Sequence, residues 1–231
     1  MSILENVEKV RKNIETAALK SGRKLEDIHL IAVTKTVGVF EIEEALKAGV
    51  SNIGENKVQE VTKKYDSVKD AAKWHLIGTL QTNKVKYIID KVDLIHSLDR
   101  IALAEEIDKR AKKISKVMDC LIQVNISLED SKHGVLKEET LDFVKEVSKR
   151  YDNLRIKGLM GMAPFELEPE DTRVYFRQMK KLSDEISKEE IPNVSMEYLS
   201  MGMTNDYMVA IEEGANMVRV GTAIFGERVY V

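Results

Sequence analysis

Eight short apolar segments alternate along this chain with longer stretches of helical periodicity, and this alternation restricts the possible folds most. In chain order the segments are IHLIAV, SNIG, WHLIG, VDLIHS, VMDCLIQVNI, RIKGLMG, MEYLSMG and MVRVG. Between two of them, Tyr175, Met179, Leu182 and Ile186 recur at steps of three and four residues, the spacing that places a stripe on one helix face. Strand and helix therefore alternate through the chain.

Continuous apolar strands joined by helical crossovers indicate a parallel sheet covered by helices. We predict an α/β fold, a single (β/α)8 TIM-type barrel. An open doubly wound sheet is the alternative, because periodicity does not give the order of the strands. No linker-like or low-complexity stretch interrupts the chain, and it has only three prolines, so we expect one domain over residues 1–231.

The first segment predicts an extra helix outside the barrel. Its apolar residues recur at helical spacing from Leu4 to Ala18, Ser2 and Glu5 have capping-box spacing, and Gly22 provides a stop. Charges occur throughout this segment, unlike in a signal peptide, and no later run reaches membrane-spanning length. We expect a soluble protein.

The charge pattern argues against nucleic acid or an anionic membrane as the partner. The 36 basic and 39 acidic side chains are interspersed and give a net charge of −3. A small molecule or a protein is the expected partner. Cys120 is the only cysteine and lies in an apolar stretch, so we interpret it as a buried thiol in a cytoplasmic protein. The four histidines lack metal-ligand spacing and are interpreted as core or surface residues.

Small and polar residues follow the predicted strands, at the barrel end where active sites form. Lys35 follows the first strand and Asn56 the second. A lysine there is either a solvated cation or an amine whose pKa burial lowers, so that it can form a Schiff base with a carbonyl. Position alone favours the solvated cation.

The last two strands are each followed by small residues and a helix start. Ser200, Gly202 and Thr204 follow the seventh strand, and Gly221 and Thr222 follow the eighth. Backbone N–H groups and hydroxyls in this arrangement can receive a phosphate, and barrel phosphate sites commonly form at this position. Ordinary turn glycines and helix caps are the alternative.

Arg219 interrupts the eighth predicted strand with a guanidinium, which needs an acceptor because it stays charged. An internal salt bridge would supply one. The ring nitrogen of a bound cofactor would serve equally well. Lys35, the glycine and threonine cradle and Arg219 together match the aldehyde, the phosphate and the pyridine nitrogen of pyridoxal 5′-phosphate (PLP).

These stretches also carry a family resemblance. The segments LIAVTKT, NIGENKVQE, WHLIGTLQTNKVK, IHSLDR, QVNISLEDSKHGV, GLMGMAPF and LSMGMTNDYMVAIEEGANMVRVGTAIFGER lie between residues 30 and 228. The sequence resembles the pyridoxal-phosphate homeostasis protein family, the proline synthetase co-transcribed homologues. Their barrel is similar to the N-terminal domain of alanine racemase, fold type III of the PLP proteins. One departure follows the lysine: the family usually continues with a basic residue and proline, whereas Val37 and Gly38 stand here.

The resemblance implies that Lys35 holds PLP as an internal aldimine and that Arg219 faces the pyridine nitrogen. It further implies that Asn56 lines the same mouth. The phosphate is expected among the residues after the last two strands, namely Ser200, Gly202, Gly221 and Thr222. No catalytic residue and no metal ligand is implied.

The resemblance implies a PLP carrier or regulator in vitamin B6 and amino- and keto-acid homeostasis, with PLP and apo PLP enzymes as partners. Arginine favours an unprotonated ring nitrogen and so restrains carbanion chemistry. Racemisation needs a second acid/base, which alanine racemase-like enzymes take from a further domain and a partner subunit. The chain ends at Val231, after the barrel, so we do not expect efficient racemisation. Because such a barrel needs no second subunit to complete its cradle, we expect a monomer. A PLP-dependent racemase, with a tyrosine such as Tyr207 as the second base, or a Schiff-base aldolase is the alternative.

Overall fold

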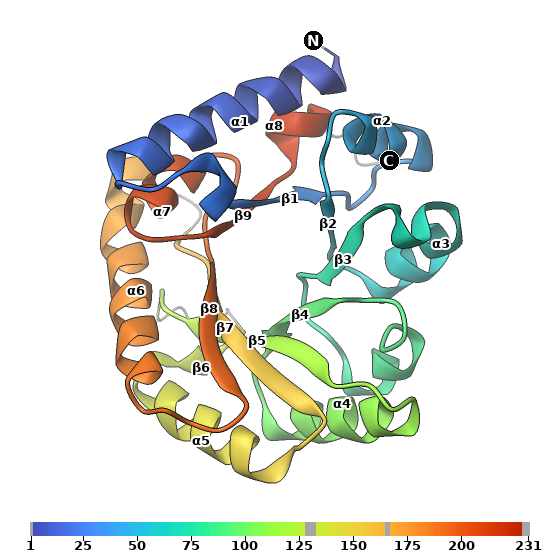
Figure 1. Ribbon diagram of the computed structural model, residues 1–231, viewed down its shortest axis with the longest axis vertical. Helices are drawn as coiled ribbons and strands as arrows, with labels where there is room; N and C mark the ends of the chain where they lie inside the picture. Colours follow the sequence, from blue (N-terminus) through green and yellow to red (C-terminus); the bar gives the residue numbers. More distant parts are fainter. Residues whose placement is uncertain (1, 128–132, 165–166, 228–231) are drawn as a thin grey trace.

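The strands form a closed parallel barrel (Figure 1). The computed structural model describes residues 2–127, 133–164 and 167–227. The ring runs β1–β2–β3–β4–β5–β7–β8–β9 and closes by pairing of β9 with β1. Its members are β1 (His29–Val33), β2 (Asn52–Glu55), β3 (Lys73–Leu76), β4 (Leu94–Leu98), β5 (Met118–Asn125), β7 (Leu154–Gly161), β8 (Val194–Ser200) and β9 (Met217–Val220). The (β/α)8 prediction is confirmed, and the open sheet is wrong.

One strand was not predicted. β6 (Val135–Leu136) pairs with the carboxyl end of β5, at Val124 and Asn125, beyond the residues that pair with β4. Two residues are too short to give a periodic signal in the sequence. The strand extends one rim of the barrel without changing its closure.

Helices cover the outside of the ring. They are α1 (Ile3–Lys20), α2 (Val39–Lys47), α3 (Val58–Val68), α4 (Ile101–Lys113), α5 (Thr140–Arg150), α6 (Arg173–Ser187), α7 (Tyr207–Glu212) and α8 (Thr222–Phe225). Short 3₁₀ turns are η1 (Leu25–Asp27), η2 (Lys69–Ala71), η3 (Thr82–Tyr87), η4 (Lys137–Glu139) and η5 (Pro169–Thr172). After β3 the crossover contains η3 where an α-helix was expected. No helix in the described ranges is long and apolar enough to cross a bilayer.

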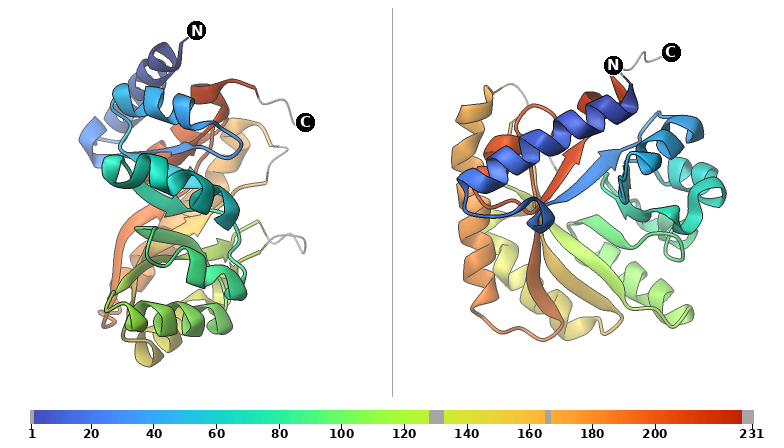
Figure 2. Two further views of the ribbon diagram at one scale, coloured as in Figure 1. Left: turned by 90° about the vertical axis from the view of Figure 1, so that its right-hand side faces the viewer. Right: turned by 45° about the horizontal axis from the view of Figure 1, so that its top comes forward.

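The extra N-terminal helix lies outside the barrel, as predicted. Ser2 and Glu5 cap α1 reciprocally, and the buried face of the helix runs from Val7 to Ala18. α1 lies beside α7 and α8 (Figures 1 and 2), and Asn6 Nδ2 donates to the carbonyl of Ile224 at 2.9 Å. The first and last segments of the chain therefore support each other.

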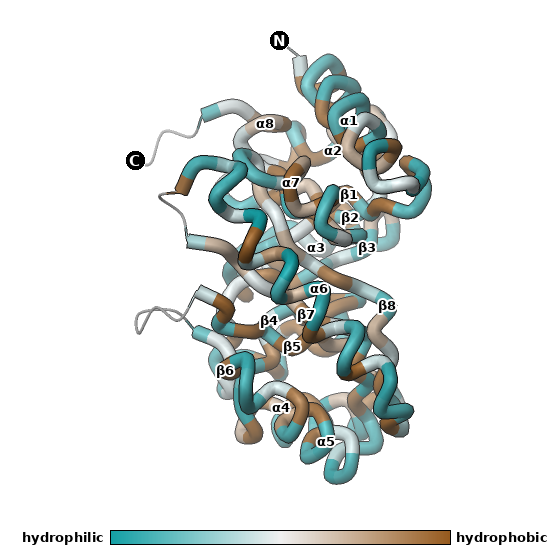
Figure 3. Tube along the Cα trace, turned by 90° about the vertical axis from the view of Figure 1, so that its left-hand side faces the viewer, coloured by the Kyte–Doolittle hydropathy of each residue, from teal (hydrophilic) through white to brown (hydrophobic). Residues whose placement is uncertain are grey.

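Two apolar clusters fill the molecule. The larger cluster lies between the strands and the helices. Figure 3 shows that α6, one of these helices, alternates between hydrophilic and hydrophobic residues along its length. The smaller consists of five buried residues from five different strands: Ile31, Leu94, Leu121, Met160 and Met217. Strand residues alternate between the two faces of a sheet, so this second cluster occupies the barrel interior. Buried polar residues share that interior.

Candidate functional site at the carboxyl-terminal mouth of the barrel

A cavity of about 350 Å³ opens at the carboxyl ends of four neighbouring strands, β1, β9, β8 and β7. Ligand pockets usually measure about 300–1,000 Å³, so this one suits a small molecule. Its walls come from β1, β9 and the segments after β1, β7, β8 and β9: Val33, Lys35, Ala163, Pro164, Leu167, Thr172, Met203, Thr204, Asn205, Asp206, Arg219, Gly221 and Thr222. The fold therefore brings together Lys35 and Arg219, which are far apart in the sequence.

Lys35 occupies a tight turn directly after β1. The Val37 N–H donates to the Thr34 carbonyl at 3.0 Å, so Lys35 and Thr36 are the central residues of this turn. Thr36 has a φ of +61°, a left-handed conformation that a β-branched residue rarely adopts. The surrounding contacts must offset this local strain.

A buried ion pair supplies such contacts from below the turn. Lys64 Nζ donates to the Thr34 carbonyl at 2.9 Å and to Glu55 Oε1 at 2.8 Å. The Thr34 hydroxyl donates to the same Glu55 oxygen at 2.7 Å. Burial raises the pKa of Glu55, although the hydrogen bond from Lys64 opposes that shift. The backbone that carries Lys35 is thereby tied to β2 and α3.

Arg219 reaches the cavity from within β9. One guanidinium nitrogen donates to Ser200 Oγ at 2.6 Å, and another donates to the Gly161 carbonyl at 3.1 Å. Burial lowers the pKa of Arg219 to about 10, while Asp206 acts in the opposite direction, so the group stays cationic at neutral pH. Among the described residues Arg219 forms no ion pair within 4.0 Å, so the internal salt bridge considered from the sequence is not found there.

The segments after β8 and β9 contact each other at the rim. The Gly221 N–H donates to Thr204 Oγ1 at 3.4 Å, and exposed Thr222 begins α8. Gly202 has a φ of +89°, and an added Cβ would lie 2.9 Å from Tyr207 Cα. Its carbonyl accepts the Arg219 N–H at 3.1 Å. Gly202 thus permits close packing beneath the cavity.

The predicted site residues divide into two groups. Lys35, Arg219, Gly221 and Thr222 line the cavity, whereas Asn56, Ser200 and Gly202 do not. Ser200 is fully buried and adjoins the site through Arg219. Asn56 follows β2, on the far side of β1 from the rest of the site, and its buried Oδ1 has no hydrogen-bond partner among the residues that the structure describes. Which of these seven residues bind a cofactor stays a prediction.

Several lining residues were absent from the predicted set. Asp206 accepts the Met203 N–H at 2.6 Å, and burial raises the pKa of its carboxyl group. Asp206 could have been found from the sequence, because it follows the seventh predicted strand two residues after Thr204. Thr172 ends η5, and no pattern in the sequence places it near β9.

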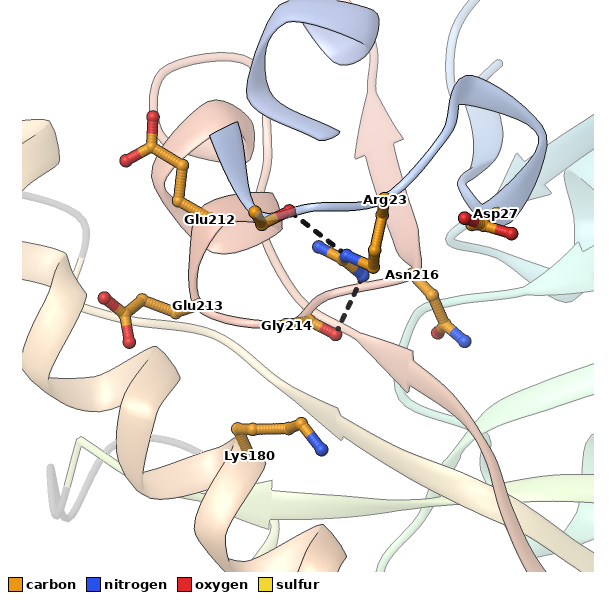
Figure 4. A pocket seen from close by; sticks show the side chains of 8 residues that line it. Arg23, Asp27, Lys180, Glu212, Glu213, Gly214 and Asn216 are labelled. Atoms are coloured by element: carbon orange, nitrogen blue, oxygen red, sulfur yellow. Dashed lines mark hydrogen bonds between the residues drawn. The ribbon is translucent and has the colours of Figure 1, made fainter. Parts of the chain in front are cut away.

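A larger cavity, of about 610 Å³, lies at the opposite end of the barrel, before β1 and β9 (Figure 4). Its charged groups are engaged in structural contacts. Arg23 donates to the carbonyls of Ile211 and Ala215, which close α7. Glu212 pairs with Lys20 at 3.0 Å, and Glu213 pairs with cations of α6. The smaller cavity is the better candidate because it is lined by Lys35 and by Arg219, some of whose donors have no protein partner in the described ranges.

Comparison with known proteins agrees with this architecture. The sequence matches the family "Alanine racemase, N-terminal domain" over residues 6–229. A pyridoxal phosphate homeostasis protein of Aquifex aeolicus is 46% identical over 231 residues, covering 100% of both chains. PipY of Synechococcus elongatus PCC7942, solved with PLP bound, is 31% identical with a TM-score of 0.84, covering 97% of this chain and 100% of PipY.

One solved structure with lower sequence identity shares only its fold with this chain. Alanine racemase of Clostridium difficile 630 has a TM-score of 0.76 at 15% identity, covering 99% of this chain and 56% of the racemase. The extent of the closer matches decides the assignment: this chain belongs to the pyridoxal phosphate homeostasis protein family, which has the barrel of the alanine racemase N-terminal domain.

Proposed function

We propose that this protein binds PLP in the cavity at the barrel mouth, covalently through Lys35, and acts as a carrier or regulator in PLP homeostasis. One observation carries the proposal. A single small cavity joins an amine, a buried guanidinium and the Gly221–Thr222 rim. The PLP bound in the structure of PipY, a relative that matches 97% of this chain, supports it.

The residues fit the cofactor group by group. When bound, PLP supplies an aldehyde carbon and an electron-withdrawing pyridine ring. The Lys35 amine matches the aldehyde, and the N–H groups of Arg219 without a protein partner in the described ranges match the ring nitrogen, an acceptor. Thr204, Gly221 and Thr222 offer hydroxyl and backbone donors for the phosphate.

Each residue has a separate part in holding the ligand. The buried Lys64–Glu55 pair orients the backbone before Lys35, and Arg219 presents donors from the barrel interior. Because arginine donates and does not accept, it stabilises an unprotonated ring nitrogen, which weakens the ring as an electron sink. This property favours a carrier over an efficient enzyme.

The surroundings of Tyr207 support the same conclusion. This tyrosine was the sequence candidate for a second acid/base in racemisation. Its hydroxyl accepts a hydrogen bond from Asn13 Nδ2 of α1 at 3.0 Å, and Tyr207 is absent from the cavity lining. The titratable side chains that line the cavity in the described ranges are Lys35, Asp206 and Arg219. We therefore propose that the protein does not catalyse a reaction efficiently.

We propose further that the protein acts as a monomer in the cytoplasm and exchanges PLP with apo PLP enzymes. This chain itself supplies the amine, the guanidinium and the phosphate-binding rim, so the site needs no second subunit to be complete, which supports a monomer. Burial raises the pKa of the Cys120 thiol, which suits an inert structural cysteine.

The test is a spectroscopic titration with PLP. We expect the wild type to bind PLP and develop a visible absorption band, and Lys35→Ala to lose that band. Lys47→Ala, which changes an exposed lysine at the end of α2, should behave as wild type. A visible band in Lys35→Ala equal to that of the wild type would refute the role of Lys35.

A second measurement separates the carrier from an enzyme. The PLP-loaded protein is incubated with single amino acids, and the products are followed by chiral chromatography and carbonyl detection. The proposal predicts turnover far below that of a dedicated racemase. Turnover at a racemase rate would reject the carrier.

A further inference from the structure

A continuous series of side-chain hydrogen bonds crosses the barrel interior and ends at Arg219. Asn52 Oδ1 contacts His75 Nε2 at 3.1 Å, and His75 Nδ1 contacts His96 Nε2 at 3.0 Å. His96 Nδ1 contacts Ser200 Oγ at 3.1 Å, and Ser200 Oγ accepts from Arg219 at 2.6 Å. Neither histidine nor Asn52 lines the cavity at the mouth.

This series connects strands that are not neighbours. His96 lies on β4 and Ser200 on β8, whereas β4 pairs with β3 and β5 and β8 pairs with β7 and β9. The bond between them therefore bridges the interior of the barrel. His75 and His96 are 4% and 0% exposed, so bulk water does not reach the two rings and their partners come from the protein.

With both rings neutral, the Asn52 end fixes the direction of every bond, because Asn52 Oδ1 can only accept. Ser200 Oγ, which has one hydrogen and two acceptor lone pairs, accepts from Arg219 and donates its hydrogen to His96 Nδ1. His96 then carries its hydrogen on Nε2 and donates to His75 Nδ1. His75 likewise carries its hydrogen on Nε2 and donates to Asn52 Oδ1. Asn52 Nδ2 donates to Ser51 Oγ at 3.1 Å, which agrees with the oxygen facing His75.

We propose that His75, His96 and Ser200 are positioning residues that hold Arg219 in one orientation toward the cavity, with both imidazoles neutral and protonated on Nε2. A proton added to either ring would remove the acceptor at its Nδ1 and force the neighbouring hydrogen of His96 or Ser200 to move, which changes the series. Reversal of the series is blocked at Asn52, because its Oδ1 faces His75 Nε2 and cannot donate. The orientation of the guanidinium is thus set from the opposite wall of the barrel.

Electrostatics support neutral rings. Burial lowers the pKa of His75 to about 3, with His29 and Lys73 acting in the same direction. Burial also lowers the pKa of His96, where the charge of Arg219 adds to the effect. The consequence for a ligand rests on the proposed function: an oriented Arg219 selects a ring nitrogen that accepts a hydrogen bond.

The first experiment needs no ligand. Nitrogen-15 NMR of histidine-labelled wild-type protein distinguishes the two neutral tautomers and the charged ring. We expect His75 and His96 to show the Nε2–H tautomer and no titration between pH 5 and 8, with His75→Gln and His96→Leu assigning the signals. An Nδ1–H tautomer or a charged ring at either position would overturn the proposal.

The second experiment measures the consequence for Arg219. In ligand-free protein, exchange of the Arg219 guanidinium signals should be slow in the wild type and faster in His96→Leu and Ser200→Ala. His133→Gln, a change at an exposed histidine outside the series, is the control. Unchanged guanidinium exchange in folded His96→Leu would refute positioning by the histidines.

The third measurement links the series to PLP. We expect His96→Leu to raise the Kd for PLP roughly tenfold, about the effect of one lost hydrogen bond, and to shift the absorption of the bound cofactor. An unchanged Kd and spectrum in His96→Leu would count against the proposal. A wild type that does not bind PLP would refute the proposed function, whereas the ligand-free experiments would still decide the role of the series.

Discussion

Substitution of Lys64 by methionine tests the buried support beneath the Lys35 turn. Lys64 is 3% exposed, and its ammonium group contacts Glu55 Oε1 at 2.8 Å, the Thr34 carbonyl at 2.9 Å and Glu60 Oε2 at 2.7 Å. Methionine retains the apolar stem and removes the charge. Glu55 is then buried with the Thr34 hydroxyl as its remaining partner in the described ranges.

The expected loss of stability in Lys64→Met follows from the buried Glu55 carboxylate, which has lost its cation. Removing one partner of a buried ion pair typically destabilises a protein by 3–5 kcal/mol. We expect about 3 kcal/mol at pH 8, because protonation of Glu55 limits the penalty. For a chain of this length, that loss lowers Tm by about 6–12 °C.

The loss of stability in Lys64→Met should depend on pH. In Lys64→Met, burial without a cation raises the folded-state pKa of Glu55 above its unfolded value. Stability is therefore lowest above the folded-state pKa, where the folded protein must bury a charged carboxylate. It recovers as the pH falls through that pKa toward 4.5, the ordinary value for the carboxyl group.

Urea denaturation followed by circular dichroism at pH 8 and pH 5 measures both effects. Lys181→Met, which breaks a pair that is 79% and 55% exposed, is the matched control and should denature as the wild type does. The double variant Lys64→Met with Glu55→Gln should recover part of the loss at pH 8. A Lys64→Met variant as stable as the wild type at pH 8 would refute this reasoning.

Four further substitutions test the site and its surroundings. Arg219→Glu should change the visible spectrum of bound PLP, because a carboxylate favours a protonated ring nitrogen; an unchanged spectrum would count against the role of Arg219. Gly202→Ala should destabilise the fold by roughly 3 kcal/mol in urea denaturation, since its φ is +89° and the new Cβ would lie 2.9 Å from Tyr207 Cα. Gly22→Ala, with φ +71° and open space around it, should cost only about 1 kcal/mol, and equal losses would contradict the packing argument. Tyr207→Phe should leave the spectrum of bound PLP unchanged, because the hydroxyl bonds to Asn13; a changed spectrum would place it at the cofactor.

The sequence was sufficient to predict the barrel because each strand carries its own local signal. Apolar runs such as the one before Lys35 mark a buried parallel strand, and all eight predicted segments form strands of the ring. The order of the strands follows from right-handed crossovers and closure rather than from any single residue. β6 escaped prediction because two residues give no period.

The candidate site was only partly predictable. Strand ends can be located from sequence, and this placed Lys35 and Gly221 at the mouth. Which side chain at a strand end enters the cavity depends on barrel twist and loop path, so Ser200 and Asn56 were placed in the mouth although they do not line it. The bond between His96 and Ser200 joins residues 104 positions apart, and no periodic pattern encodes it.

The central claim is that Lys35 holds PLP at the barrel mouth, and borohydride reduction followed by peptide mass spectrometry tests it most directly. Reduction converts a reversible link between an amine and an aldehyde into a stable one. We predict that the added mass of the reduced cofactor appears on the peptide containing Lys35 and is absent from Lys35→Ala. Stoichiometric label on another lysine, or none in protein incubated with excess PLP, would contradict the account.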